Sequence, residues 1–360
     1  MEEIIRLELF SVQEVKHWLV TGNSERGLSD AVIAKQRAYA IVNNPYATDD
    51  LKIISALFVN DKVVAYTYLF PDKIRIQDNA GEFYERLIYW NTALYCDPQY
   101  EGRGYAFIVI GQFCELYGED YFDLDAAEAS VENLKFAGLT VEYIQQYVLS
   151  NKIIRGNNFI SKLARLKERI TLRLISKKNK LIRDIHSSCY KLEYVSYIDD
   201  EVYQFIVEHS MDNLFIRSQK MLNWILNSHF MQPCPLLHRV QKDNVFTSNR
   251  NFFAFYGVKV MVNNNLVGFY IFSDSNEIWY LNYLYYNEMY ETDVFNSIAE
   301  HIFHSKRPKV YTCSNKLWSY LKSFNLYSRV FIFNKSFAYP SSFEYNKSKH
   351  IQAGDGDNIT

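Results

Sequence analysis

The chain has 360 residues, 48% of them hydrophobic, and a formal net charge of −2, which is enough material for two domains. Its five cysteines are widely spaced and form no metal-binding pattern, so we expect no metal and a reducing, cytoplasmic compartment. The sequence contains no run of eighteen apolar residues, and its acidic N-terminus is unlike a secretory signal, so neither a membrane span nor export is predicted.

In chain order, the first part of the sequence alternates between helical and extended patterns. The predicted helices cover residues 11–20, 29–42, 105–116 and 126–137, with Ser11 and Ser29 or Asp30 as caps and Gly138 as a left-handed end. The predicted strands cover residues 51–59, 63–70, 87–96 and 121–124. We therefore expect a first domain over residues 1–150.

A basic segment follows this domain. Residues 1–150 carry 12 Lys/Arg and 23 Asp/Glu, whereas the remainder carries 27 and 18. Within the remainder, residues 162–183 hold nine bases and one acid, and their apolar residues recur near helical spacing. The pattern predicts a basic helical linker over residues 151–190. It either packs on a domain or contacts an anionic surface through residues 160–183.

The second part of the sequence alternates in the same way, which predicts a second domain over residues 191–345. Its predicted strands cover residues 252–262, 266–272, 278–286, 310–313 and 329–334. Its predicted helices cover residues 295–304 and 316–324, with a further helical segment at 217–226. The polar tail over residues 346–360, with two Gly-Asp pairs, is expected to be disordered.

The two domains share an internal repeat. Residues 58–66 (FVNDKVVAY) align without gaps with residues 261–269 (MVNNNLVGF), and both predict a β-hairpin. Further along, residues 94–108 align with residues 284–298. In the second copy, Thr292-Asp293-Val294 replaces the Gly-Arg-Gly of the first. Chance does not readily produce two matches in the same order, so we interpret the chain as a tandem repeat.

A glycine-rich loop lies at residues 101–106 (EGRGYA), between an apolar strand and an apolar helix. Glycines let a backbone approach a ligand closely, and the free N–H groups of a helix's first turn attract anions. A dinucleotide site would need a third glycine and a downstream acid, and a P-loop would need Gly-Lys-Ser/Thr. Neither pattern is present, so a different phosphate-bearing ligand is expected.

Residues 94–106 (LYCDPQYEGRGYA) resemble the acyl-CoA loop of the Gcn5-related N-acetyltransferase (GNAT) superfamily, which reads Arg/Gln-Gly-x-Gly-x-Gly/Ala after the fourth strand. Glu101 departs from this pattern. The resemblance implies an α/β fold with an α+β mixed sheet, built from two tandem GNAT-like acyl-CoA N-acyltransferase domains. The second domain is degenerate, because its copy has lost the glycines.

The resemblance also implies acetyl-CoA or another acyl-CoA as co-substrate and an amine as acceptor. The residues expected to bind the cofactor are Leu94, Tyr95, Cys96, Gly102, Arg103, Gly104, Tyr105 and Ala106. Along the fourth strand and after the fifth, Glu85, Asn91 and Asp125 are candidates for the general base. Leu134 stands where the family often has a tyrosine acid, so the thiolate would take its proton from Tyr143 or from solvent.

The sequence thus predicts a CoA-dependent N-acyltransferase, in the first instance an N-acetyltransferase. An aminoacyl or longer-acyl transferase, and a non-catalytic binding or scaffold protein of the same fold, are the alternatives. The acceptor can be an amino sugar, a small amine or a peptide, and no specific nucleic-acid partner is expected. Trp279, Tyr283 and Tyr285 of the second domain are expected to help wall the acceptor groove. The alternative is that these rings are core, and alternation along the strand requires this of some of them.

Overall fold

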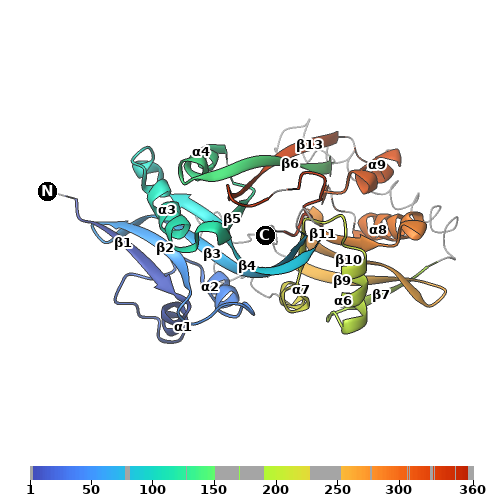
Figure 1. The fold of residues 1–360 in the computed structure, drawn as a ribbon, viewed down its shortest axis with the longest axis horizontal. Helices are drawn as coiled ribbons and strands as arrows, with labels where there is room; N and C mark the ends of the chain where they lie inside the picture. The colour runs from blue at the N-terminus through green and yellow to red at the C-terminus, as the bar shows by residue number, and fades with distance from the viewer. Residues whose placement is uncertain are drawn as a thin grey trace.

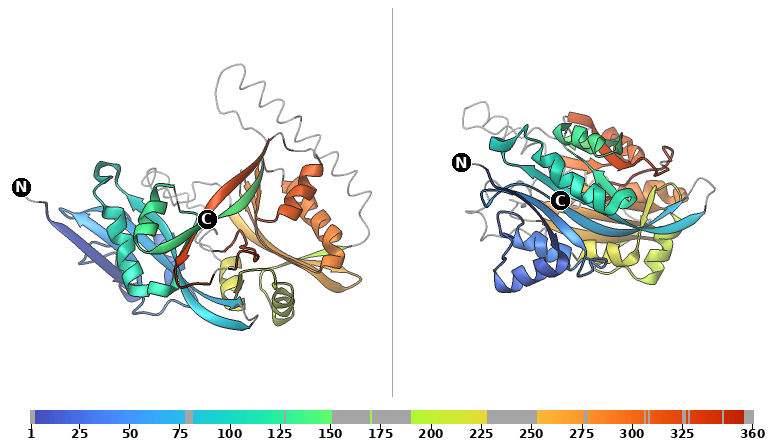
Figure 2. Two further views of the ribbon diagram at one scale, coloured as in Figure 1. Left: turned by 45° about the horizontal axis from the view of Figure 1, so that its top comes forward. Right: turned by 60° about the vertical axis from the view of Figure 1, so that its left-hand side comes forward.

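The computed structural model is elongated, with the N-terminus at one end and the C-terminus between its two halves (Figure 1). It describes residues 3–77, 82–126, 128–150, 170, 190–227, 253–275, 278–305, 307, 309–324, 327, 329–344 and 346–355. One mixed sheet of 13 strands runs through both halves, in the order β1-β2-β3-β4-β5-β13-β6-β12-β11-β10-β9-β7, with β8 paired to β3. Helices cover the faces of this sheet (Figure 2).

The first half begins with a strand and two helices and continues with the hairpin and the glycine loop. Its elements are β1 (Ile5–Ser11), α1 (Val12–Thr21), α2 (Lys35–Val42), β2 (Lys52–Val59), β3 (Lys62–Gln77), β4 (Phe83–Cys96), η1 (Pro98–Tyr100), α3 (Tyr105–Tyr117), η2 (Gly118–Asp120), β5 (Tyr121–Leu124), α4 (Glu128–Phe136) and β6 (Leu139–Ser150). Ser11 caps α1 in a capping box with Glu14, as predicted, and the next helix starts only at Lys35.

The second half repeats this sequence of elements. They are β7 (Lys191–Val195), α6 (Asp200–Glu208), β8 (Phe215–Arg217), α7 (Gln219–Leu226), β9 (Phe253–Val262), β10 (Asn265–Ser275), β11 (Ile278–Tyr286), η4 (Glu288–Tyr290), α8 (Glu291–Ser305), β12 (Lys309–Thr312), α9 (Asn315–Ser323) and β13 (Arg329–Pro340). Among the described elements, β8 has no counterpart in the first half and η2 has none in the second. The repeat predicted from the sequence is therefore confirmed at the level of whole elements.

The two hairpin turns correspond residue by residue. Asn60 and Asp61 have φ of 49° and 62°, and their counterparts Asn263 and Asn264 have 50° and 63°. Positive φ at both central residues is the mark of a two-residue turn whose twist matches the strands, and Asn and Asp tolerate it. The sequence match at this hairpin thus reflects a shared backbone conformation.

The two halves exchange their last strands. β13 pairs with β6 along its whole length, from Arg329 opposite Ser150 to Pro340 opposite Leu139. β13 also pairs with β5 of the first half, and β6 pairs with β12 of the second. Each half of the sheet is therefore completed by a strand from the other half. The sequence predicted the start of β13 and gave no indication of β6.

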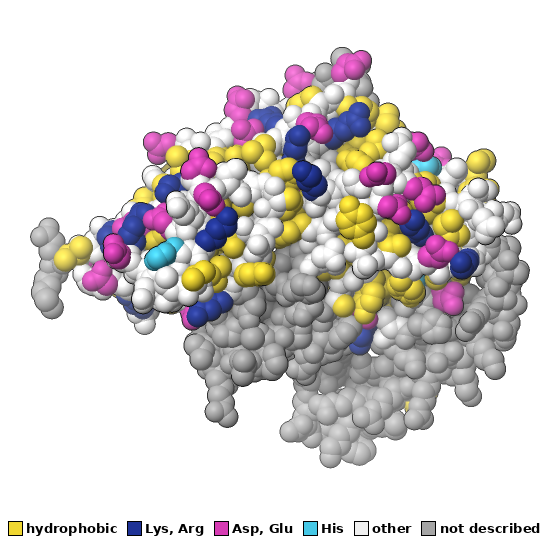
Figure 3. All heavy atoms as spheres, turned by 90° about the horizontal axis from the view of Figure 1, so that it is seen from below, with side chains coloured by type: hydrophobic (Ala, Val, Ile, Leu, Met, Phe, Trp, Pro, Cys, Tyr) yellow, Lys and Arg dark blue, Asp and Glu magenta, His cyan; other side chains and the backbone are white. Residues whose placement is uncertain are grey.

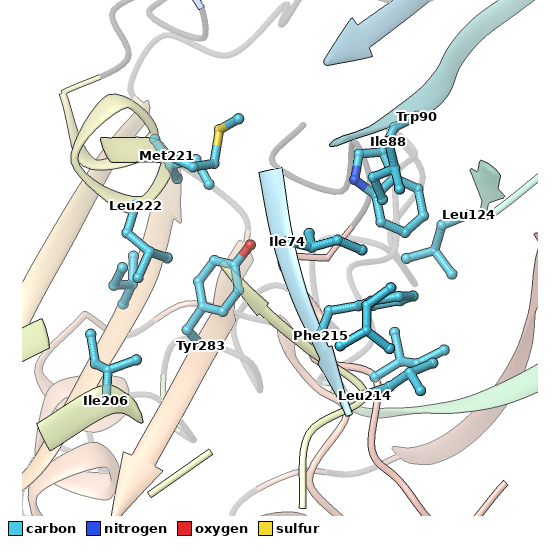
Figure 4. Close-up of a cluster of buried hydrophobic side chains, with 14 of the residues drawn as sticks. Ile74, Ile88, Trp90, Leu124, Ile206, Leu214, Phe215, Met221, Leu222 and Tyr283 are labelled. Carbon is cyan, nitrogen blue, oxygen red and sulfur yellow. The ribbon is translucent and has the colours of Figure 1, made fainter. Parts of the chain in front are cut away.

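A hydrophobic cluster joins the halves. Figure 4 shows Ile74, Ile88 and Trp90 of the first half on one side, with Leu222 and Tyr283 of the second half facing them. The aromatic residues expected in an acceptor groove are instead core: Trp279, Tyr283 and Tyr285 are at most 2% exposed. This prediction was wrong because both faces of β11 are covered: Trp279 packs in one core cluster, and a bulge at Asn282 turns Tyr283 and Tyr285 into another.

The C-terminal segment corrects another prediction. Residues 351–355, expected to be disordered, are buried between the halves. The Gly354 N–H donates to the carbonyl of Asn282 at 2.8 Å, and the Tyr283 hydroxyl donates to the Gly354 carbonyl at 2.5 Å. Polar composition alone hides such a segment, because backbone hydrogen bonds rather than apolar side chains hold much of it. Residues 356–360 lie outside the described residues.

The predicted basic linker, residues 151–190, also lies outside the described residues except for residues 170 and 190. The domain limits at 150, 190 and 345 therefore remain predictions from the sequence. None of the described helices is long and apolar enough to cross a membrane.

Candidate functional site

The glycine loop has an open backbone. Gly102 and Gly104 have φ of 78° and 79°, a left-handed conformation that favours glycine. A Cβ atom built on either residue meets no atom within 4 Å. Both glycines are thus required by conformation, and the space beside them is free to receive a ligand.

Helix α3 starts directly after this loop. Gly104 is its N-cap residue and supplies no side-chain cap. The first N–H groups of a helix have no partner within the helix and carry the positive end of its dipole. The Ala106 N–H lies against the Cys96 thiol; burial, the largest influence, nevertheless raises the pKa of that thiol. The carboxylates of Glu101 and Asp97 raise the pKa of the thiol as well, so the end of β4 and the start of α3 meet at a point with both amide donors and nearby acids.

Charged residues surround the loop. Asp97 caps η1 and pairs with Lys62 at 2.7 Å, a hydrogen bond that lowers the pKa of Asp97. Arg103 pairs with Glu3 at 2.9 Å and lies over the ring of Tyr100. Both members of the Arg103–Glu3 pair are exposed, and such pairs contribute little to stability. Arg103 can accordingly exchange this partner for a phosphate at little cost.

A bulge interrupts β4 just before the loop. The register between β3 and β4 shifts after Tyr66, and Ala93 has φ of 60°. An extra residue in one strand leaves backbone groups unpaired and bends the strand. On its other side, β4 pairs with β5 only as far as Asn91 opposite Asp123. The backbone of residues 93–96 thus faces a split between β4 and β5.

A buried hydrogen-bond network lies at the closed end of this split. The Asn91 Nδ2 donates to Asp123 Oδ2 at 2.5 Å, and the Thr67 hydroxyl donates to Asn91 Oδ1 at 2.6 Å. All three side chains are buried. Hydrogen bonds in such surroundings fix side-chain orientation, because breaking them leaves polar groups unsolvated. Asn91 is therefore held rigidly beside the bulge.

Of the other predicted catalytic residues, Asp125 lies nearest to the split. It follows β5 directly, with φ of 73°, and pairs with the buried Lys335 of β13 at 2.7 Å. Glu85 is eight residues before Ala93 on β4, which is about 25 Å along a strand, and forms an ion pair with Lys73. Tyr143 lies opposite Ser336 on β6, two strands from β5. Asn91 thus lies at the closed end of the split and Asp125 directly after β5, whereas Glu85 and Tyr143 lie farther along or across the sheet.

The second half lacks an equivalent loop. Helix α8 begins at Glu291, so a helical turn stands where the first half has its glycines. Val294, the counterpart of Gly104, is buried against Gly268, and a Cβ on Gly268 would lie 2.5 Å from its Cγ2. The degeneracy predicted from Thr292-Asp293-Val294 is thus a change of backbone as well as of side chains.

The chain's own C-terminal segment fills the split of the second half. There β11 pairs with β12 as far as Tyr280 opposite Tyr311. Beyond that point the Gly354 N–H donates to the Asn282 carbonyl at 2.8 Å, and the Leu284 N–H donates to Gln352 Oε1 at 2.7 Å. Leu284 aligns with Leu94 of the first half. Two amide groups thus occupy the strand edge that corresponds to the bulged edge of β4.

No protein-family model and no curated protein sequence matches the chain. A structure from Enterococcus faecalis V583, titled a conserved protein of unknown function and probable N-acyltransferase, matches with a TM-score of 0.50 and 10% identity over 93% of this chain and 72% of that chain. Two structures of Saccharomyces cerevisiae N-myristoyltransferase match with TM-scores of 0.50 and 0.51, at 12% and 11% identity, over 93% and 97% of this chain and 82% and 84% of theirs.

The chain has the GNAT fold, in tandem. Identities of 10–12% establish the fold alone, so the chemistry must be argued from the residues of this chain. Within the GNAT fold of the first half, the bulge, the split and the glycine loop follow one another along β4 and α3. The second GNAT half keeps the strands and loses the open site.

Sequence reasoning missed a buried ion cluster between the two GNAT halves. Arg217 Nε lies 3.3 Å from Asp72 Oδ2 and 3.7 Å from Asp355 Oδ1, and all three residues are at most 1% exposed. Trp90 donates its indole N–H to Asp72 at 3.1 Å. Burial raises the pKa of Asp355 to about 7 although Arg217 lowers it, and burial raises the pKa of Asp72 as well.

Among the residues that the sequence analysis missed, Asp123 has a sequence signal and the others have none. Asp123 is a lone acid inside the apolar strand YFDL, a pattern that could have identified it. Asp72 follows a proline at the end of an expected strand, and Asp355 lies in a polar tail, so neither stands out. The bulge at Ala93 has no sequence signal, because alanine rarely adopts positive φ.

Proposed function

We propose that the first half binds an acyl-CoA and transfers its acyl group to an amine. The observation that carries the proposal is the succession of bulged strand, split sheet and open glycine loop in the first half. These features offer amide donors to a diphosphate at one end and, beyond it, a strand edge that β5 does not cover. An acyl-CoA has the matching order of groups, with its pyrophosphate, then its two pantetheine amides, then its thioester.

In this proposal the pyrophosphate lies on the N–H groups of residues 102–106, with Arg103 turned from Glu3 toward it. The pantetheine arm follows the backbone of Leu94, Tyr95 and Cys96. The C-terminal segment supports this arrangement, because its amides bind the corresponding edge in the second half through Asn282 and Leu284. The edge of β4 would thus bind the amides of a ligand, whereas the edge of β11 binds amides of the chain's own C-terminal segment.

The chemistry requires an amine nitrogen to attack the thioester carbonyl. The carbon–sulfur bond then breaks, and the CoA thiolate leaves and takes up a proton. A backbone N–H at the bulge would stabilise the developing oxyanion, so no dedicated side chain is needed. Asp125 at the end of the split is our candidate for the base that accepts the amine's proton, with Asn91 as the residue that fixes the geometry. Roles for Glu85 and Tyr143 remain predictions.

The finer identity of the reaction is also part of the proposal. We propose acetyl-CoA as the first donor to test, with longer acyl-CoA esters and aminoacyl donors as alternatives. The acceptor would be an amino sugar, a small amine or a peptide. A non-catalytic protein of the same fold would bind the donor without releasing CoA, so binding and turnover have to be measured separately.

The experiment is calorimetric titration of acetyl-CoA and longer acyl-CoA esters into wild type, Gly104→Val and Gly111→Ala. Valine at position 104 adds a β-branched side chain where φ is 79° and where the phosphate would approach. We expect at least a tenfold loss of affinity, on the order of 1.4 kcal/mol. Gly111 lies inside α3 with open space around it, so Gly111→Ala is the matched control and should bind as wild type does.

Release of free CoA with a panel of amines then distinguishes an enzyme from a binding protein. Equal affinity of wild type and Gly104→Val would refute the proposed pyrophosphate site. Two CoA molecules bound per chain would refute the assignment of a single site to the first half.

A further inference from the structure

Four consecutive hydrophobic residues are exposed in the first half of β13. The exposed fractions of Val330, Phe331, Ile332 and Phe333 are 37%, 37%, 51% and 49%. Every residue from 329 to 334 is exposed, whereas residues 335–340 of the same strand are buried. A strand packed in a sheet normally buries at least one face. This half-strand needs a partner that the described residues do not supply.

Both faces of the half-strand are apolar. Because successive side chains alternate, Phe331 and Phe333 lie on one face and Val330 and Ile332 on the other. The two phenyl rings stack with their centroids 5.9 Å apart. Ile332 lies opposite Tyr147, which places it on the face that carries α9. A partner must therefore surround the tip of the strand rather than cover one side of it.

Two cations lie beside this tip. Residues 301–343 contain seven Lys/Arg and no Asp/Glu, and three of the seven, Arg307, Lys316 and Lys335, pair with acids from other segments. Lys309 and Arg329 both lie opposite Ser150, so two cations stand on either side of β6 at this end of the sheet. Lys322 of α9 lies over the Trp318 ring at 5.0 Å. By contrast, acidic and basic side chains intermingle on the face that Figure 3 shows.

We propose that this tip, residues 329–333 with Lys309, docks on an anionic lipid surface. Phenylalanine and aliphatic side chains would enter the head-group region on both sides of the strand, and the cations would contact anionic head groups. A fluid lipid surface can cover both faces at once, which a single rigid protein surface does not. Shallow docking also leaves the backbone edge of the strand among head groups and water, where it can be hydrogen-bonded.

The main competitor is strand addition by a second copy of this chain. β5 pairs with β13 only at Phe337 and Ala338, so the edge of residues 329–335 is not covered by β5. Exposed apolar edges invite another strand. Strand addition, however, makes no use of Lys309 and Arg329, and two like-charged tips would repel each other. Charge therefore favours the lipid surface.

The experiment is sedimentation of the full chain with vesicles of phosphatidylcholine alone and of phosphatidylcholine with 30% phosphatidylserine. We expect wild type to bind the anionic vesicles and to be released by 0.5 M NaCl, because the contact is largely electrostatic. Phe331→Ser with Phe333→Ser should lower partitioning at least tenfold, and Lys309→Gln with Arg329→Gln should remove the preference for phosphatidylserine. Val20→Ser with Met289→Ser, at sites 87% and 83% exposed elsewhere, is the matched control and should bind as wild type does.

Circular dichroism of each variant checks that folding is intact before the binding data are compared. The proposal is overturned if wild type fails to sediment with anionic vesicles, or if the Phe331/Phe333 variant binds as well as wild type. A dimer in analytical ultracentrifugation that dissociates in that variant, without vesicle binding by wild type, would assign the tip to strand addition instead.

Discussion

Protonation of Asp355 gives the sharpest prediction for stability. Arg217 carries one positive charge between two buried carboxyl groups, and it lies closer to Asp72 than to Asp355. One cation can neutralise only one carboxylate, and an uncompensated buried charge is costly. Burial accordingly raises the pKa of Asp355 to about 7 from an ordinary value of 3.8. The folded protein should hold this proton through a pH range in which the unfolded chain has lost it.

The difference between the folded and unfolded pKa of Asp355 sets the sign and the size of the pH dependence of stability. Between about pH 4 and pH 7 the folded state binds one proton more than the unfolded state, so the free energy of unfolding decreases as pH rises. A pKa difference of about 3 corresponds to about 4 kcal/mol, lost progressively across that range. Burial raises the pKa of Asp72 as well, which adds a contribution of the same sign. Asp355→Asn replaces the protonated carboxyl by a neutral group of similar size and should remove the part due to Asp355.

The assay is urea unfolding at pH 5 and at pH 8, followed by intrinsic fluorescence, for wild type and Asp355→Asn. Between pH 5 and pH 8 wild type should lose about 3 kcal/mol of this stabilisation, because roughly two of the three pH units lie in that interval. The variant should change less and should be more stable than wild type at pH 8. If instead Asp355→Asn destabilises the protein at pH 8, the carboxylate is ionised and paired with Arg217, and the reasoning is refuted.

Three further substitutions test other parts of the structure by their effect on unfolding free energy. Gly268→Ala places a Cβ 2.5 Å from Val294 and should cost about 1–3 kcal/mol; a neutral result would mean that α8 shifts freely. Asn91→Ala removes the hydrogen bonds to Asp123 and should cost about 1–3 kcal/mol, and unchanged stability would show that the network is solvated. Ser11→Ala removes the α1 cap and should lower the free energy of unfolding by about 1 kcal/mol. An unchanged thermal midpoint in a calorimetric scan would contradict this.

The sequence was most informative where a pattern is local. Gly102 and Gly104 could be recognised because a left-handed backbone favours glycine. The hairpins at Asn60 and Asn263 could be recognised because their turns favour asparagine. The repeat could be read because both copies retain these local requirements. The register from β4 through η1 to α3 followed from the same residues.

Long-range pairing was not accessible in this way. The sequence of β6 mixes polar and apolar residues, because after Leu139 only the last five residues of the strand are buried. The second-half strand β12, with which those last residues pair, lies more than 150 residues later in the chain. The role of Asp355 depends on Arg217 and Asp72, which are far from it in sequence and meet it only through the exchanged sheet. The bulge at Ala93 arises from the pairing of whole strands rather than from the preference of one residue.

The exchange of β6 and β13 also bears on how the chain comes to fold during synthesis. β5 emerges from the ribosome some 200 residues before Phe337 and Ala338, its partners in β13. Until then the first half has an incomplete sheet and β6 lacks both of its neighbours. Contacts of such sequence separation slow folding, and unpaired strand edges favour aggregation while they wait. Synthesis of residues 329–340 therefore closes the sheet of the first half, and a chain released before residue 340 would leave both halves open.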